Sequence, residues 1–423
     1  MTPRTETSVG PVAARERIQL LDAVRGMALG GILLANLMSF FGTDMLTDDA
    51  RRALPWSTVS DRVLFAVDWL VEGKFYSVFS ILLGIGFALQ SARAERGAAT
   101  DRFAGFFRRR MTVLLVIGAV HMFVLWSGDI LMLYGLMGLF LPGLARLQST
   151  RRTIVMLALF AVPLATHVTV VLSKGALDPR PPFAATGAAL RHHWGVEERG
   201  TLDLFARGSS ADYFAWNTAN AIVRPGTYLQ SGRPAKVLAL FLLGVWLGQA
   251  VLPRATTLQR ALWLTLLIGA AVGLPTSFEY ASIKAATRST FLVSREGLVQ
   301  TAAYTLGTTP LALAYLAGAT LAWRTPSGRP WLEWFVPLGR MALTVYLTQS
   351  VVQLAIFSSH GLALAGRISI AWLPLVAALI LGTQRYVCAF WLQRHAHGPL
   401  EWIWRSATYR GLNPAAGPQA RLH

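Results

Sequence analysis

The chain has 423 residues, of which 54% are hydrophobic and 14% are charged, and its formal net charge is +18. This composition is too apolar for an ordinary soluble enzyme, so most of the chain is expected to face lipid. The positive charge does not indicate nucleic acid, because Lys and Arg cluster in short segments between apolar runs. The single cysteine, Cys388, excludes an intrachain disulfide and a Cys-based metal site.

The apolar windows along the chain predict an all-α integral membrane protein. Spanning a bilayer takes about 20 residues, and windows of about this length indicate a bundle of about ten transmembrane helices. They cover residues 19–41, 73–92, 111–127, 129–146, 153–173, 235–252, 260–276, 297–323, 331–357 and 369–392. Trp126, Ser127, Gly128 and Asp129 interrupt one apolar stretch, which predicts a tight hairpin there.

Basic residues fall in every second connection between the windows, which predicts that both termini are cytoplasmic. The polar first 17 residues lead into the first window without a small-residue cleavage site, so no removable signal peptide is predicted. The amphipathic residues 59–72 are expected in the outer interface. The predicted organisation is a cytoplasmic tail (1–18), an amino-terminal bundle (19–173), an extracytoplasmic loop or cap (174–234), a carboxyl-terminal bundle (235–393) and a basic cytoplasmic tail (394–423).

Polar residues at membrane depth are costly and therefore informative. Asp22 and Arg25 lie within one turn of the first window, which fits a local ion pair, an anion-binding arginine, or both. His121 precedes Asp129 by eight residues across the predicted hairpin. A lone histidine in an apolar helix is more often a core residue, but a carboxylate within reach would fix its tautomer for acid–base work. Lys74 is expected to snorkel to the outer surface.

The ninth window carries a polar helix face after a break at Pro337 to Gly339. A hydrogen-bonded helix interface explains such a face without a ligand, and a ligand-lining role is the alternative because Arg340 lies toward the cytoplasmic side, as Arg25 does. Its polar residues are Arg340, Thr344, Tyr346, Thr348, Gln349 and Ser350. No ligand-spaced cluster indicates a metal and no Gly-rich loop indicates a nucleotide fold.

Five strings in the chain resemble the YeiB-like family of bacterial membrane proteins, a domain of unknown function. They are RIQLLDAVRGMALGGILLAN, GKFYSVFSILLGIGF, GAVHMFVLWSGDILMLYGLMGL, LGRMALTVYLTQS and GPLEWIWR, which runs from residue 398 to 405 and also reads as an aromatic interface anchor. The family is similar in its amino-terminal half to transmembrane acyltransferases that include heparan-glucosaminide N-acetyltransferase. The resemblance implies acyl transfer from a cytoplasmic acyl-CoA to an acceptor across the membrane, with an extracytoplasmic histidine as base.

The resulting hypothesis is a bacterial inner-membrane acyltransferase that uses acetyl-CoA or another acyl-CoA and no metal. His121 and Asp129 are the expected catalytic pair, although His192, His193 and His360 also lie outside. The donor is expected near Arg25, Arg340, Thr344, Tyr346 and Gln349. The acceptor, a sugar or another hydroxyl or amine, the acyl chain length and the role of loop 174–234 stay open. Small-residue helix faces permit a homodimer. The alternatives are a small-molecule transporter or a non-catalytic receptor.

Overall fold

The computed structural model describes residues 19–96, 100–197, 199–251 and 258–409, and the described chain folds into helices and turns without a strand. The predicted tail 1–18 and the basic residues Arg254 and Arg410 lie outside these ranges. The helices are α1 (Gln19–Phe41), α2 (Asp48–Arg52), α3 (Ser57–Leu70), α4 (Lys74–Arg96), α5 (Thr100–Val120), α6 (Leu131–Ala145), α7 (Ser149–Leu172), α8 (Arg180–His193), α9 (Thr201–Arg207), α10 (Ser210–Gln230), α11 (Arg233–Trp246), α12 (Gln259–Thr287), α13 (Arg295–Trp323), α14 (Gly328–Glu333), α15 (Val336–Arg340), α16 (Ala342–Phe357), α17 (Leu373–Arg394) and α18 (Pro399–Tyr409).

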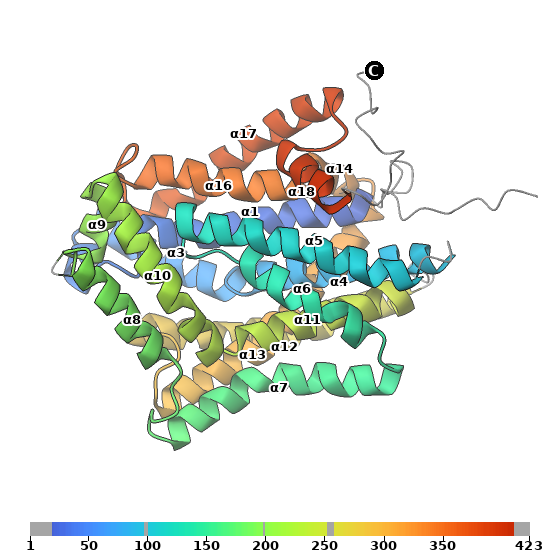
Figure 1. Ribbon diagram of the computed structural model, residues 1–423, viewed down its shortest axis with the longest axis horizontal. Coiled ribbons are helices and arrows are strands. Elements are labelled where there is room, and N and C mark those ends of the chain that lie inside the picture. The colour runs from blue at the N-terminus through green and yellow to red at the C-terminus, as the bar shows by residue number, and fades with distance from the viewer. Residues whose placement is uncertain (1–18, 97–99, 198, 252–257, 410–423) are drawn as a thin grey trace, which may run out of the picture.

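The long helices lie side by side as a bundle whose axis is horizontal in Figure 1. Among the described residues, five helical segments are long and apolar enough to cross a membrane. Those segments are Gln19–Phe41, Ser57–Arg96, Ser149–Leu172, Gln259–Thr287 and Ile370–Arg394. Large apolar side chains such as Leu267 and Leu379 are about 60% exposed along them, which is the pattern of helices that face lipid rather than water. The prediction of an all-helical membrane protein is confirmed at this level.

The predicted hairpin between residues 111 and 146 is present as α5 and α6. The two helices touch backbone to backbone, because a Cβ on Gly118 would lie 2.1 Å from the Met132 nitrogen and one on Gly135 would lie 2.5 Å from the Leu115 nitrogen. The end of α5 continues into a π-helical turn, His121–Leu125, which is closed by a hydrogen bond from the Trp126 N–H to the His121 carbonyl. This close packing brings the start of α6 against the end of α5.

The predicted ninth helix is divided into α14, α15 and α16. The chain leaves the helical conformation at Met341 (φ −114°, ψ 37°), between α15 and α16. The expected break is present but displaced, since Pro337 to Gly339 belong to the short helix α15 and the interruption follows at Met341. Arg340 and Thr344 therefore do not lie on one continuous helix. The α15 segment instead packs on α1, where a Cβ on Gly339 would lie 1.8 Å from the Asp22 carbonyl oxygen.

The segment 174–234 is helical and forms α8, α9 and α10. These helices lie with α3 at the left-hand end of the bundle in Figure 1, whereas α14 and α18 lie toward the right-hand end. The aromatic side chains of Phe65 and Trp69 on α3 pack on Phe278 of α12, with ring centroids 5.2 and 5.4 Å apart. Residues 59–72 are thus packed against the bundle, where α3 forms part of a cavity wall.

Candidate functional site

Asp129, His121 and Ser350 form a buried chain of hydrogen bonds. The Asp129 Oδ1 lies 2.7 Å from the His121 Nδ1, and the His121 Nε2 lies 2.9 Å from the Ser350 Oγ. All three residues are about 1% exposed. An ionised carboxylate only accepts hydrogen bonds, so the His121 Nδ1 carries the proton and the neutral Nε2 accepts from the Ser350 hydroxyl. This arrangement aims the basic nitrogen of the imidazole at a hydroxyl group.

The backbone around the hairpin holds Asp129 in place. Its Oδ2 accepts a 2.6 Å hydrogen bond from the Met132 N–H at the start of α6, and its carbonyl oxygen accepts a 2.6 Å bond from the Tyr228 hydroxyl of α10. The amino-terminal end of α6 therefore fixes the position of the Asp129 carboxylate. The sequence placed His121 and Asp129 at the same hairpin without showing that they touch, and it contained no signal that Ser350, 229 residues after His121, would complete the group.

A cavity of about 940 Å³ lies beside this chain of hydrogen bonds. Tyr346 and Gly128 line it, and the Tyr346 ring centroid is 5.4 Å from that of His121. The His121 side chain lies behind Tyr346 rather than in the cavity wall. Three other residues that line the cavity, Asp44, Thr58 and Arg62, are exposed to solvent. The cavity therefore opens at the end of the bundle where α2 and α3 lie.

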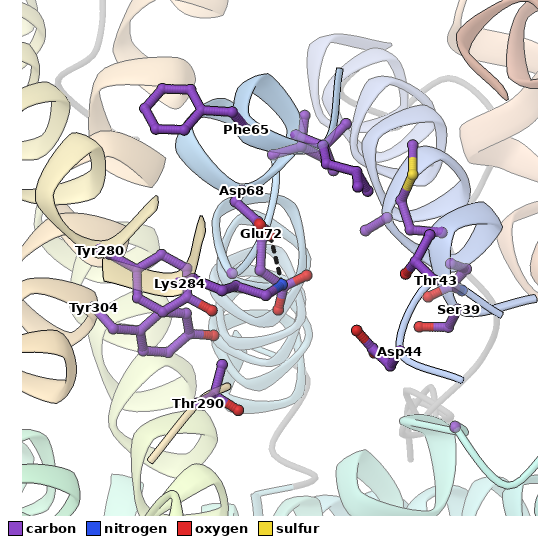
Figure 2. A pocket seen from close by; sticks show the side chains of 18 of the residues that line it. Ser39, Thr43, Asp44, Phe65, Asp68, Glu72, Tyr280, Lys284, Thr290 and Tyr304 are labelled. Atoms are coloured by element: carbon purple, nitrogen blue, oxygen red, sulfur yellow. Dashed lines mark hydrogen bonds and ion pairs between the residues drawn. The ribbon is translucent and has the colours of Figure 1, made fainter. Parts of the chain in front are cut away.

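Charged and aromatic side chains line much of the cavity. Figure 2 shows Lys284 and Asp68 joined by an ion pair, with Tyr280 and Tyr304 beside them and Asp44 facing them across the space. The Lys284 Nζ is 2.7 Å from the Asp68 Oδ1. A pair of charges on helices that face a bilayer is tolerated where the charges satisfy each other or face a wet cavity. The cavity is therefore suited to a polar ligand.

Two buried lysines near the cavity were missed or misread from sequence. Lys74 is fully buried and its Nζ donates to the Asp68 carbonyl oxygen at 2.9 Å, so the expectation that it snorkels to the surface is wrong. Lys236, which lies in an apolar window, is 2% exposed and donates to the Thr308 Oγ1. Snorkelling depends on which face of the helix the lysine occupies, and that face is set by packing.

Arg25 lies at the contact between α1 and α15, and Arg340 is the last residue of α15. The Arg25 Nη1 donates to the Asp22 Oδ1 at 2.7 Å and to the Gly339 carbonyl at 3.4 Å, so the expected local pair with Asp22 is present. The Nε of Arg340 is buried and has no hydrogen-bond partner in the described structure. Arg25 precedes the first cavity residue of α1, Gly31, by six positions, which is about 9 Å of helix. The two arginines thus lie below the cavity.

The other predicted donor-binding residues mainly join helices to one another. The Thr344 hydroxyl donates to the Glu401 Oε2 at 2.6 Å, and the N–H groups of Leu343 and Thr344 donate to the Glu401 Oε1 at 2.6 and 3.0 Å. Gln349 donates to Gln384 on α17 at 3.1 Å. Glu401 therefore caps the start of α16, and the string at 398–405 has a defined structural role. Tyr346 is the member of the predicted set that lines the cavity.

The alternative histidines lie away from the buried chain. His192 and His193 are exposed on α8, and the His192 Nδ1 lies 2.8 Å from the Glu197 carboxylate. The His360 Nε2 lies 3.0 Å from the Ser210 Oγ at the partly exposed end of the bundle. None of the three is part of the cavity lining. Within the ranges that the structure describes, no group of three or more His, Cys, Asp and Glu side chains is arranged to hold a metal ion.

Comparison with known proteins places the chain among full-length relatives. Residues 236–411 match a family described as "Protein of unknown function (DUF418)". "Uncharacterized protein YxaH" of Bacillus subtilis is 27% identical over 417 residues, which cover 97% of this chain and 98% of the relative. "Uncharacterized protein YeiB" of Escherichia coli is 27% identical over 428 residues, covering 96% and 100%. The chain is therefore similar to YeiB-like proteins, whose function is unknown, along almost its whole length. No solved structure gives a significant match.

The site of this YeiB-like chain is divided between its two halves. The residues that match the family description include Arg340, Tyr346 and Ser350, whereas His121 and Asp129 lie before them. The full-length relatives span both halves. The hydrogen bond from Ser350 to His121 therefore joins the DUF418 region to the amino-terminal part of the YeiB-like protein.

Proposed function

We propose that the protein is a bacterial inner-membrane acyltransferase that moves an acyl group, most simply acetyl, from cytoplasmic acyl-CoA to an extracytoplasmic hydroxyl or amine, such as that of a sugar. The observation that carries the proposal is the buried Asp129–His121–Ser350 chain beside a large polar cavity. In this arrangement ten helices cross the membrane with both termini in the cytoplasm, and the cavity faces the other side. The crossing helices are α1, α4, α5, α6, α7, α11, α12, α13, α16 and α17.

The reaction follows from the direction of the hydrogen bonds. The acceptor hydroxyl or amine attacks the thioester carbonyl, and the bond between the carbonyl carbon and sulfur breaks. The acceptor proton passes to Ser350 as the Ser350 hydroxyl gives its own proton to the His121 Nε2, and the resulting imidazolium is stabilised by Asp129. The departing CoA thiolate takes up one proton, so that the imidazole returns to its neutral state without a covalent acyl-enzyme.

The donor enters at the opposite end of the bundle, where α1 with Arg25 packs on α15 with Arg340. Guanidinium groups suit phosphate oxygens, and the buried Arg340 Nε without a partner marks a donor that a ligand can engage. From there the acyl end points along α1 toward Gly31 and the cavity. Tyr346 stands between the donor and acceptor sides, since it follows Arg340 by six residues and lines the cavity.

Calorimetric titration of the detergent-purified protein with acetyl-CoA and CoA tests the donor site. We expect saturable binding that is weakened at least about tenfold in Arg25→Ala and Arg340→Ala, because a lost charge-assisted contact to phosphate costs about 1.5–3 kcal/mol. Arg394→Ala, at the end of α17, is the matched control and should bind like the unmodified protein. Absence of binding to any acyl-CoA would refute the proposal.

A transporter is the second candidate, and the interruption at Met341 favours it. Transporters bind substrates near discontinuous helices, and the chain leaves the helical conformation between α15 and α16. A transporter has no need to recognise CoA. The same titration therefore separates the two functions, since only the acyltransferase requires a binding isotherm that depends on Arg340.

A further inference from the structure

Two arginines form a wall of the cavity next to the buried chain, and their charges are not balanced there. Arg224 of α10 and Arg233 of α11 both line the cavity. Within the described residues neither guanidinium has a carboxylate at ion-pair distance, and the Arg224 Nε is buried without a hydrogen-bond partner. Two carboxylates of the cavity are engaged elsewhere, because Asp68 pairs with Lys284 and Asp61 pairs with Arg51.

Aromatic rings hold the two arginines in fixed positions. The guanidinium carbon of Arg224 lies 5.0 Å from the Tyr228 ring centroid, and that of Arg233 lies 5.4 Å from the same ring and 5.5 Å from Tyr76. Stacking on aromatic faces orients a guanidinium and leaves its edge N–H groups available for an acceptor. The pair is thus preorganised to donate hydrogen bonds into the cavity.

A buried lysine lies beside this wall. Lys236, one turn after Arg233, lies with its Nζ 4.2 Å from the Tyr304 ring centroid. Glu72, which also lines the cavity, is a carboxylate that acts electrostatically on Arg233. One carboxylate facing two guanidiniums leaves an excess of positive charge at this wall, at membrane depth, where charges are normally paired. An anionic ligand would supply the missing counter-charge.

The arginine pair is one side chain away from the proposed catalytic group. The Tyr228 ring lies under both guanidiniums, and its hydroxyl donates to the Asp129 carbonyl oxygen at 2.6 Å. We propose that Arg224 and Arg233 bind an oxyanion, a carboxylate or phosphate group, of a ligand that enters the cavity from its open rim. If acyl transfer is the reaction, this ligand is the acceptor of the acyl group and carries an acidic group. The assignment of the ligand as acceptor rests on the proposed function.

Inorganic phosphate is the probe for this site. The unfolding midpoint of the detergent-purified protein is followed against phosphate concentration, with ionic strength held constant by chloride. Ligand binding raises the midpoint by mass action, and phosphate also stabilises proteins non-specifically. The response to phosphate is therefore compared between the variants Arg224→Gln and Arg233→Gln and the control Arg207→Gln. Arg207 is an exposed arginine of α9 that pairs with Asp203.

We expect the phosphate concentration for half-maximal stabilisation to rise at least about tenfold in each cavity variant and to stay unchanged in Arg207→Gln. Arg233→Lys keeps the charge but loses the guanidinium group. Its phosphate concentration for half-maximal stabilisation should lie between those of Arg233→Gln and the unmodified protein, and this variant keeps the test usable if a Gln variant fails to fold. A second arm replaces phosphate with nanodiscs of phosphatidylglycerol or phosphatidylcholine. If only phosphatidylglycerol gives a stabilisation that depends on the arginines, the ligand is a lipid headgroup. If phosphate gives such a stabilisation, the ligand is a free oxyanion. Equal responses in all variants would overturn the oxyanion site.

No acyl-CoA enters this experiment, so its outcome is independent of donor binding. Phosphate binding that depends on Arg224 and Arg233 together with no CoA binding would leave the anion site standing and remove the acyltransferase. Binding of CoA without any arginine-dependent effect of phosphate would do the reverse.

Discussion

Replacing Asp129 by Asn tests the proposed base with little change of shape. The carboxylate accepts hydrogen bonds from the His121 Nδ1 and from the Met132 N–H. An Asn side chain has one acceptor oxygen, and the backbone N–H of Met132 has no alternative tautomer, so the oxygen stays with Met132. The amide NH₂ then faces the His121 Nδ1, and the imidazole proton moves to Nε2. In that tautomer Nε2 cannot accept a proton from Ser350.

We expect Asp129→Asn to lower the rate of acyl transfer strongly and the free energy of unfolding only slightly. General-base catalysis contributes about 10²–10⁴-fold, which corresponds to about 3–5 kcal/mol of transition-state stabilisation. Because both hydrogen bonds are retained in exchanged form, the free energy of unfolding should fall by only about 1 kcal/mol. The assay is release of free CoA from acetyl-CoA in the presence of an extract of the producing cell's envelope, alongside calorimetric binding of CoA and thermal unfolding.

Asp203→Asn, on the exposed face of α9, is the matched control because it makes the same chemical change at an exposed ion pair. A rate for Asp129→Asn within about threefold of the unmodified protein would refute the reasoning. If Asp129→Asn loses both CoA binding and the transfer rate, Asp129 is needed for the structure of the hairpin and not for the chemical step.

Three further changes test other parts of the structure. Ser350→Ala should slow CoA release by at least about tenfold if the hydroxyl relays the proton, and an unchanged rate in the same assay would show that His121 contacts the acceptor directly. Gly118→Ala should lower the free energy of unfolding by about 1–3 kcal/mol, since its Cβ would lie 2.1 Å from the Met132 nitrogen, whereas Gly143→Ala, with open space around it, should not. Glu401→Gln should destabilise the docking of α18 by about 1–3 kcal/mol, which limited proteolysis of the tail would detect as faster cleavage.

Hydropathy along the chain was sufficient to predict the helical membrane class and the position of most long helices. These properties depend on the composition of about 20 consecutive residues, so they can be read locally. The interruption at Trp126 to Asp129 likewise predicted the hairpin, because a polar and glycine-containing turn cannot continue an apolar helix. The spacing of His121 and Asp129 placed both residues near the same hairpin, but their 2.7 Å hydrogen bond is visible only in the structure.

Contacts between distant helices were decided by tertiary packing. Ser350 meets His121, and Glu401 caps α16, over separations of 229 and 58 residues. The burial of Lys74 and Lys236 depends on the rotation of α4 and α11 within the bundle, which hydropathy does not encode. That rotation is set by backbone contacts at glycines, such as the 2.0 Å that would separate a Gly84 Cβ from the Phe241 carbonyl oxygen. Composition thus determined that the helices enter a membrane, and close helix packing determined which polar side chains meet inside it.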